Sequence, residues 1–339
     1  MSFACGGWLQ FYMYGVARAL QAAGYDSPDT VTYCGCSAGA LTAVGLAIEG
    51  DFDGAVRFCK ESCVPQAWGH VKGLFKLGDY VSECIDMLVM PNYRQLAPGQ
   101  LQLAVTKLPF FQAERVTEFA SKEDLKQALM ASVAAFPAAP LVLRHGQYYM
   151  DGGVSDFQPV VDADTITVSP FYFSDCDIRP SRYVPLWWAF LPPKNTDTID
   201  WLYALGWEDC MAYLEKRGLC LRSERARSHL REIDRTSHPY DTPRRVSVHR
   251  VLGYNLGNLT CEYGSFALDF MLLVVFIVLW KPLALGLIYL ELSVHVGVHV
   301  GACTGRLLRS VAETAPPHRP SPSFPLPLPQ RGSSRAPCS

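Results

Sequence analysis

The stretch Tyr33–Leu41, "YCGCSAGAL", places a serine between two glycines directly after a β-favouring run. Gly35, Ser37 and Gly39 have the spacing G-x-S-x-G, which is typical of a nucleophilic serine on a sharp strand-to-helix turn. Such a turn strains the backbone, so the residues two positions away must lack side chains. The run Ala40–Val44 favours a following helix, whose N-terminal amides would stabilise negative charge near the serine. The alternative is a glycine-rich turn with an incidental serine.

A second informative stretch is Tyr148–Val160, "YYMDGGVSDFQPV". Asp151 follows a strand-like run and precedes Gly152 and Gly153, which let the backbone pass close to another element and leave the carboxylate uncrowded. A serine needs a base to become nucleophilic, and this carboxylate is a candidate. The alternative is an ordinary hairpin turn, because Asp-Gly is among the commonest turn dipeptides.

A third stretch, Ser2–Leu20 ("SFACGGWLQFYMYGVARAL"), predicts a short strand, a loop at Gly6 and Gly7, and an amphipathic helix. Consecutive backbone amides in such a loop form an anion-binding concavity. An ordinary strand-to-helix turn is the alternative. A nucleotide-phosphate loop is disfavoured, because the glycine patterns of dinucleotide and P-loop sites are both missing from the sequence.

The composition sets the broad class of protein. The chain has 339 residues, of which 49% are hydrophobic, enough for one sizeable α/β domain with an appendage. The net charge of −2 gives no field that would attract nucleic acid. Twelve cysteines follow no paired zinc spacing, and Met1 is followed directly by the first predicted strand, so we expect reduced cytosolic thiols and no signal peptide.

Residues 1–220 alternate short apolar runs with helical stretches, which predicts a globular α/β domain with a mainly parallel central sheet. The predicted strands are Thr30–Cys34, Leu101–Thr106, Leu141–Arg144 and Thr165–Ser169. The predicted helices are Tyr14–Ala23, Ala40–Glu49, Asp53–Cys63, Lys122–Ala131 and Thr198–Lys216.

Three further zones follow this domain. Residues 221–265 are polar and rich in arginine, as in a linker or a solvated helix. Residues 266–303 form an apolar segment, which we expect to associate with a membrane. Residues 304–339 are rich in proline and serine and cannot bury a core, so we expect a disordered tail.

The apolar segment leaves three alternatives open. Residues 266–290 exceed the roughly 20 apolar residues that a membrane-spanning helix needs. Lys281 and Pro282 interrupt it, and both disfavour a straight helix in lipid. A single kinked span, an interfacial or re-entrant hairpin that turns at these residues, and a soluble core helix all fit. With either membrane arrangement we expect the catalytic domain on the cytoplasmic side.

The three glycine-bearing motifs, in this order, resemble the patatin-like phospholipase family, in the animal-type branch that includes the adipose triglyceride lipases. The similarity extends to "GVARAL" at 15–20, "YMDGGVSD" at 149–156, and "TITVSP" at 165–170 before "DIRP" at 177–180. It covers residues 1 to about 215 and implies a patatin-like three-layer α/β/α fold.

The resemblance implies a serine–aspartate dyad. Ser37 would attack an ester carbonyl, Asp151 would accept its proton directly, and the amides of Gly6 and Gly7 would hold the oxyanion. The substrates implied are glycerolipids, either phospholipids or triacylglycerols, at a membrane or lipid-droplet surface. The implied reaction passes through an acyl-enzyme and uses neither a cofactor nor a metal.

Two positions depart from the family's loop, which carries three glycines and a further one three residues on. Cys5 stands at the first of these positions and Gln10 at the last. Either side chain would crowd or shift the oxyanion site. A catalytically weak or inactive lipid-binding scaffold and a lipid transacylase therefore remain alternatives to the hydrolase.

Histidine and metal chemistry are weaker alternatives. A histidine base would have to come from the turn at His145 or from the polar segment, at His229, His238 or His249. Glu291, His295 and His299 are spaced four apart and would share one face of a helix as metal ligands. The sequence "VHVGVHV" around the two histidines fits a strand equally well.

The membrane assignment yields a testable prediction. We expect the full chain to sediment with membranes and to resist carbonate extraction, because its apolar run left in water would be a large exposed patch. A chain that ends near Arg250 should be soluble and cleave short water-soluble esters, but not bilayer or droplet lipids. If this shortened chain is unfolded or insoluble, the segment belongs to the protein core.

Overall fold

The computed structural model describes residues 1–25, 31–69, 73, 75–219, 282–283, 285–290 and 293. The chain divides into two compact units, Met1–Tyr289 and Leu290–Ser339, and the elements named here belong to the first. The predicted linker at 221–265 and the predicted tail at 304–339 lie outside the described residues, as does most of the apolar segment at 266–303. Within the described part, no helix is both long and apolar enough to cross a bilayer.

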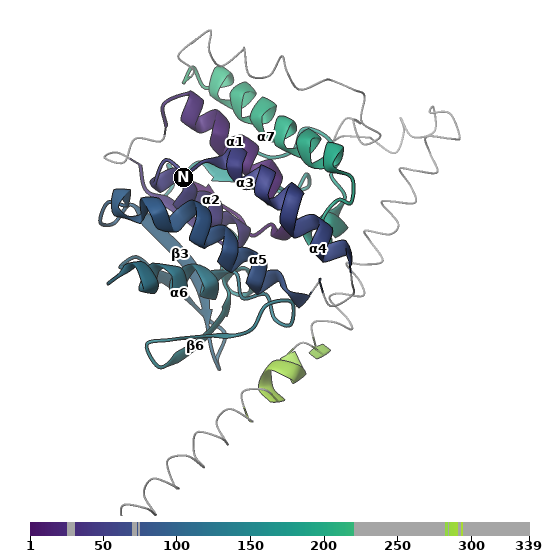
Figure 1. The fold of residues 1–339 in the computed structure, drawn as a ribbon. Helices are drawn as coiled ribbons and strands as arrows, with labels where there is room; N and C mark the ends of the chain where they lie inside the picture. The colour runs from purple at the N-terminus through teal and green to yellow at the C-terminus, as the bar shows by residue number, and fades with distance from the viewer. Residues whose placement is uncertain are drawn as a thin grey trace, which may run out of the picture. The chain divides into compact units, whose positions relative to one another are not determined.

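Strands and helices alternate through residues 1–219, as the sequence predicts (Figure 1). The strands are β1 (Ser2–Phe3), β2 (Tyr33–Cys36), β3 (Leu101–Lys107), β4 (Gln112–Val116), β5 (Val142–Arg144), β6 (Gln147–Asp151) and β7 (Thr167–Val168). The α-helices are α1 (Gln10–Ala22), α2 (Ala38–Ala47), α3 (Phe52–Phe58), α4 (Val64–Gly69), α5 (Leu77–Cys84), α6 (Lys122–Ser132) and α7 (Thr196–Lys216). Each predicted element is present with shifted ends, whereas α4, α5 and β4 were not predicted.

The sheet is mixed rather than mainly parallel, which corrects the prediction from the sequence. Its order is β5-β6-β3-β2-β1-β7, with β4 paired to β3 beside this path. The pairs β1–β2, β1–β7 and β2–β3 are parallel, whereas β3–β4, β3–β6 and β5–β6 are antiparallel. The short connections after β3 and β5 account for the pairs β3–β4 and β5–β6, because a tight hairpin can only join antiparallel strands. The third antiparallel pair, β3–β6, joins strands that are far apart in the sequence.

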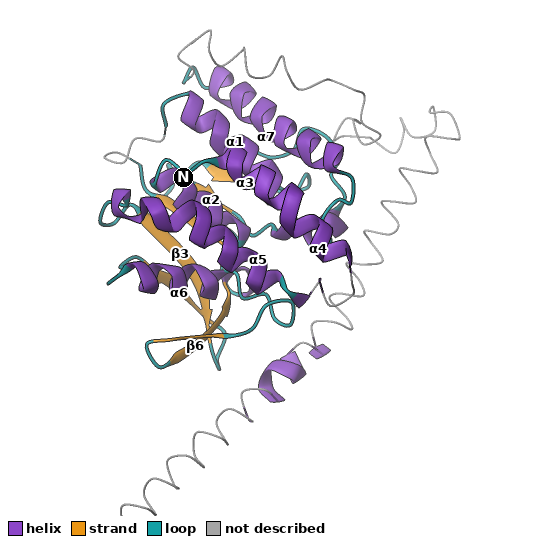
Figure 2. Cartoon of the chain, in the orientation of Figure 1, coloured by secondary structure: helices purple, strands orange, loops and turns teal. Residues whose placement is uncertain are grey.

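The helices α2 and α6 contact each other and cover the sheet from one face, as Figure 2 shows for α2, α6 and strand β3. The opposite face of β2 is covered by an irregular segment, residues 157–160. The thiols of Cys34 and Cys36, which point to this face, donate hydrogen bonds to the carbonyls of Pro159 (3.0 Å) and Phe157 (3.1 Å). The strand that leads to Ser37 is therefore buried on both faces.

The helices α1 and α7 lie side by side although about 180 residues separate them in the sequence (Figure 1). Two glycines allow this approach. A Cβ atom on Gly15 would lie 2.0 Å from the carbonyl oxygen of Tyr203, and one on Gly206 would lie 2.0 Å from that of Tyr12. The backbones are thus in direct contact, and α7 forms part of the same core as α1.

This contact predicts a large effect for a single methyl group. We expect Gly206→Ala to lower the free energy of unfolding by about 1–3 kcal/mol, because the added Cβ forces α1 and α7 apart. Chemical denaturation followed by circular dichroism measures the loss. Gly69→Ala is the matched control, since a Cβ at that helical position meets no atom within 4 Å. Equal stability of the two variants would show that α7 is not held by this contact.

Candidate active site

Ser37 is the single residue between β2 and α2, and its backbone is strained. Its φ of 53° and ψ of −126° lie in a region that residues with side chains rarely occupy. A Cβ on Gly35 would lie 2.3 Å from the carbonyl oxygen of Gly39, and one on Gly39 would lie 2.3 Å from that of Phe3. The spacing G-x-S-x-G is therefore a steric requirement of this turn.

A serine of helix α6, Ser132, holds the turn at Ser37 in place. The backbone amide of Ser37 donates a hydrogen bond to Ser132 Oγ at 3.0 Å, and Ser132 Oγ in turn donates to the carbonyl of Ala104 at 2.8 Å. One buried hydroxyl thus joins the turn to strand β3. The sequence did not single out Ser132, because an isolated serine in a helix carries no motif.

Asp151 is the last residue of β6, and the register of the sheet brings it beside Ser37. On β3, Ala104 pairs with Cys36 of β2, and the next residue, Val105, pairs with Asp151. Strand β4 pairs with Leu103–Lys107 and so occupies one edge of β3. The strands β2 and β6 therefore lie end to end along the opposite edge of β3. The last residue of one strand therefore meets the turn that follows the other.

The carboxylate of Asp151 is buried and only partly satisfied. Its side chain is 5% exposed, and Oδ1 accepts a hydrogen bond from the amide of Gly153 at 2.8 Å. Among the described residues, Oδ2 has no hydrogen-bond partner in place, although the neighbouring Ser37 hydroxyl interacts with the carboxyl group. Burial raises the pKa of Asp151 to about 6, against the opposing effects of Ser37 and Gly153.

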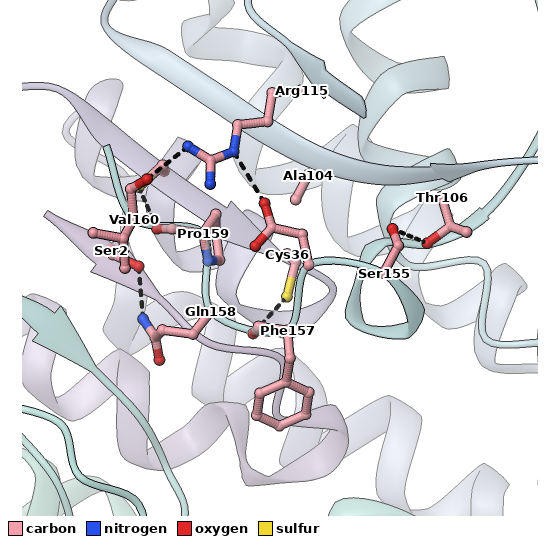
Figure 3. A network of polar contacts seen from close by, with 12 residues as sticks. Ser2, Cys36, Ala104, Thr106, Arg115, Ser155, Phe157, Gln158, Pro159 and Val160 are labelled. Carbon is pink, nitrogen blue, oxygen red and sulfur yellow. Dashed lines mark hydrogen bonds and ion pairs between the residues drawn. The ribbon is translucent and has the colours of Figure 1, made fainter. Parts of the chain in front are cut away.

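The segment after Asp151 is anchored to four strands, and Figure 3 shows most of these contacts. Three of the anchors are polar side chains of the segment and one is a backbone carbonyl. They are Ser155 with Thr106 of β3 (2.8 Å), Asp156 with Arg115 of β4 (3.0 Å), the Phe157 carbonyl with the Cys36 thiol of β2 (3.1 Å), and Gln158 with Ser2 of β1 (2.6 Å). Thr106 also donates to the carbonyl of Asp151 at 2.7 Å. These contacts restrict the movement of the carboxylate.

Gly6 and Gly7 lie between β1 and α1, and their amides have no acceptor within the described part of the chain. Gly7 has a φ of +52°, and a Cβ there would lie 2.1 Å from the carbonyl oxygen of Ala189. Gly7 lines the same pocket as Ser37. A loop with two unpaired amides at this place can bind an oxyanion.

Cys5 and Gln10, the departures from the family's loop, occupy different sides of the site. The thiol of Cys5 is hydrogen-bonded to that of Cys36 and lies where a Cβ on Gly153 would reach, at 2.8 Å. Gln10 is the first residue of α1 and lines the pocket, where its Nε2 donates to Cys59 Sγ at 3.7 Å. Gln10 is thus held against the pocket wall by a thiol.

The pocket beside Ser37 is narrow and mainly apolar. Its cavity volume is about 40 Å³, room for about three water molecules. It is lined by Gly7, Trp8, Gln10, Ser37, Ala38, Leu41, Cys59, Cys63, Leu77, Tyr80, Val81, Cys84 and Val133. No local sequence pattern marks this set of residues, since its members come from separate elements.

The structure does not bring a described histidine to this site. His145 lies in the β5–β6 turn, at the opposite end of β6 from Asp151, with its side chain 64% exposed beside Asp124. His229, His238 and His249 lie outside the described residues, as do Glu291, His295 and His299. The described part of the chain holds no cluster of three residues suited to a metal.

Together these features define an α/β protein with a strained serine turn that faces a buried carboxylate. Residues 1–164 match the family model "Patatin-like phospholipase". This match and the relatives described next confirm the resemblance of this domain to the patatin-like family of the animal type.

Curated relatives agree with this assignment. The chain is 29% identical to the mouse (Mus musculus) 1-acylglycerol-3-phosphate O-acyltransferase Pnpla3 over 67% of this chain and 62% of the relative. It is 28% identical to the human (Homo sapiens) patatin-like phospholipase domain-containing protein 4 over 64% of this chain and 96% of the relative. It is 30% identical to the bovine (Bos taurus) patatin-like phospholipase domain-containing protein 2 over 53% of this chain and 38% of the relative.

The chain spans 62% and 52% of the lengths of the mouse and human Pnpla3 relatives that it matches. Among solved structures, VipD from Legionella pneumophila is similar at a TM-score of 0.32, with 17% identity over 48% of this chain and 47% of that chain. Such a low score supports no comparison of sites.

The raised pKa of Asp151 predicts how stability depends on pH. The folded chain releases this proton near pH 6 and the unfolded chain near pH 4, so the charge costs stability as pH rises through that range. We expect the stability of Asp151→Asn relative to the wild type to increase between pH 4 and pH 7. A shift of about two pKa units sets the limit of this gain at roughly 3 kcal/mol.

Urea denaturation across this pH range measures the difference. Asp164→Asn is the matched control, because it removes the carboxylate of an exposed aspartate. A difference between Asp151→Asn and the wild type that stays flat with pH would mean that the Asp151 carboxylate is already charged at low pH.

Proposed function

We propose that the chain is a serine acyl hydrolase that cleaves carboxylic esters of glycerolipids with Ser37 as nucleophile and Asp151 as base. One observation carries the proposal: a serine on a strained turn lies beside a buried carboxylate oxygen that lacks a partner. A buried unpaired acceptor is costly, and such costs are concentrated at functional sites.

Asp151 is suited to act on Ser37 without a histidine. With a pKa of about 6, it is mostly charged at neutral pH yet more basic than an exposed aspartate. Its free Oδ2 accepts the proton of the Ser37 hydroxyl as Ser37 Oγ attacks the ester carbonyl. In the described part of the chain no histidine stands between the two groups, and His145 lies at the far end of β6.

The amides of Gly6 and Gly7 then hold the oxygen of the tetrahedral intermediate, and the N-terminus of α2 adds its dipole. When the intermediate collapses, Asp151 returns the proton to the leaving alcohol. The acyl group stays on Ser37 as an ester. Asp151 next takes a proton from water, which attacks this ester and releases the fatty acid.

The apolar pocket supports a substrate with an acyl chain. Leu41, Val81 and Val133 offer hydrocarbon surface next to Ser37. The cavity is too narrow for a whole lipid, so the walls must separate as the chain enters. The family and its relatives support glycerolipids as the substrate class. We also propose that the enzyme works at the surface of a membrane or lipid droplet, where such substrates are found.

A transacylase is the second candidate, because the mouse and human Pnpla3 relatives are named 1-acylglycerol-3-phosphate O-acyltransferases. The two activities share the acyl-enzyme and differ in the group that resolves it. Supplying a radiolabelled phospholipid with and without lysophosphatidic acid separates them: a hydrolase releases free fatty acid in both cases, whereas a transacylase transfers the label to the acceptor.

We expect a fluorophosphonate probe to label the wild type and not Ser37→Ala. Asp151→Asn should lose nearly all labelling and esterase activity, and the double variant should be little worse than either single variant, because the two residues act as one unit. Asp164→Asn and His145→Ala should keep most activity. A folded wild type with neither labelling nor esterase activity would leave only the lipid-binding scaffold. Labelling or full activity that persists in folded Ser37→Ala would place the nucleophile at another residue.

A further inference from the structure

Three thiols line the pocket beside Ser37, and the proposed reaction uses none of them. Cys59 and Cys63 belong to a π-helical turn that follows α3, and Cys84 is the last residue of α5. Their exposed fractions are 2%, 2% and 7%. A reagent that meets these thiols in the folded protein must therefore enter through the pocket.

The thiols interact with one another and with Gln10. Gln10 Nε2 donates to Cys59 Sγ, so the Cys59 sulfur is an acceptor on that side. Cys59 is also hydrogen-bonded to Cys63 and Cys84. The bond from Cys59 lowers the pKa of Cys84, although burial opposes this. The pKa of Cys59 is raised well above its usual value, because its bonds to Cys63 and Cys84 favour its neutral form. Cys84 is also the most exposed of the three thiols, at 7% against 2% for Cys59 and Cys63, so a reagent in the pocket reaches it most readily. A lowered pKa favours the thiolate, which is the reactive form.

The surroundings of Cys84 select the kind of reagent. Leu77, Val81 and Val133 line the same pocket and present hydrocarbon to whatever enters. A thiolate is a soft nucleophile, so its partner here is a carbon electrophile that carries an apolar chain. Fatty aldehydes with a conjugated double bond have both properties, and their chains resemble those of the lipids in the proposed function.

We propose that Cys84 is a covalent modification site for α,β-unsaturated fatty aldehydes, and that the adduct fills the pocket and blocks Ser37. The Cys84 sulfur forms a bond to the β-carbon, and the electrons of the double bond move to the α-carbon. That carbon takes up the proton released by the thiol. The step is an addition without a leaving group, an oxidant or a reductant. The block of Ser37 rests on the proposed function, whereas the addition itself does not.

The test uses the reduced full chain and nonenal, a nine-carbon α,β-unsaturated aldehyde. The chain is treated with one molar equivalent, the adducts are stabilised with borohydride, and the remaining thiols are capped in denaturant before peptide mass spectrometry. We expect Cys84 to carry most of the adduct, and fluorophosphonate labelling of Ser37 to fall in parallel. Gln10→Ala should slow the addition at least about threefold, because one hydrogen bond of the chain is lost.

Matched controls separate the pocket from general thiol reactivity. In urea, all cysteines should react alike, so a preference for Cys84 in the native chain reports the folded pocket. Cys210→Ser should keep the wild-type pattern, because this buried thiol does not line the pocket. For each protein, fluorophosphonate labelling of Ser37 after nonenal is divided by its labelling before nonenal. This ratio should be higher for Cys84→Ser than for the wild type.

An adduct on the partly exposed Cys5 or Cys176, with Cys84 unmodified, would overturn the proposal. So would a Gln10→Ala chain that reacts at Cys84 as fast as the wild type. If the untreated chain shows no labelling of Ser37, the proposed hydrolase fails, while the adduct map still decides whether Cys84 is a modification site.

Discussion

The candidate site depends on how two strands share one edge of β3. The parallel strand β2 pairs with β3 as far as Ala104, and the antiparallel strand β6 takes over at Val105. Since β4 holds the opposite edge, the ends of β2 and β6 have to meet. Ser37 and Asp151 lie at this junction, about 115 residues apart in the sequence. A one-residue slip in either pairing would point these side chains to opposite faces of the sheet.

Close backbone contacts preserve this junction. A side chain on Gly39 would meet the carbonyl of Phe3, one on Gly152 would meet that of Ala104, and one on Gly7 would meet that of Ala189. The glycines of all three motifs therefore sit where separate segments touch. The same contacts place the Gly6–Gly7 loop, the serine turn and the aspartate around one small volume, which explains why the motifs occur together.

The electrostatic state of Asp151 follows from this packing. The turn and the anchored segment after β6 remove the carboxylate from water, and only the Gly153 amide and Ser37 compensate for the loss. A group in this state has a raised pKa and a high affinity for a proton. The fold thus bears a local electrostatic cost, and the same cost gives the carboxylate the basicity that a direct proton transfer from serine requires.

The sequence by itself determined the local features: the alternation of strands and helices, the turn at Gly35–Gly39, and the family, because each is encoded by neighbouring residues. It also suggested Ser37 as nucleophile and Asp151 as a candidate base, and the resemblance joined the two as a direct dyad. Tertiary structure decided the mixed sheet, the role of Ser132 in holding the turn, and the pocket with its three thiols. These depend on strand register and on contacts between residues far apart in the chain, for which no local pattern exists.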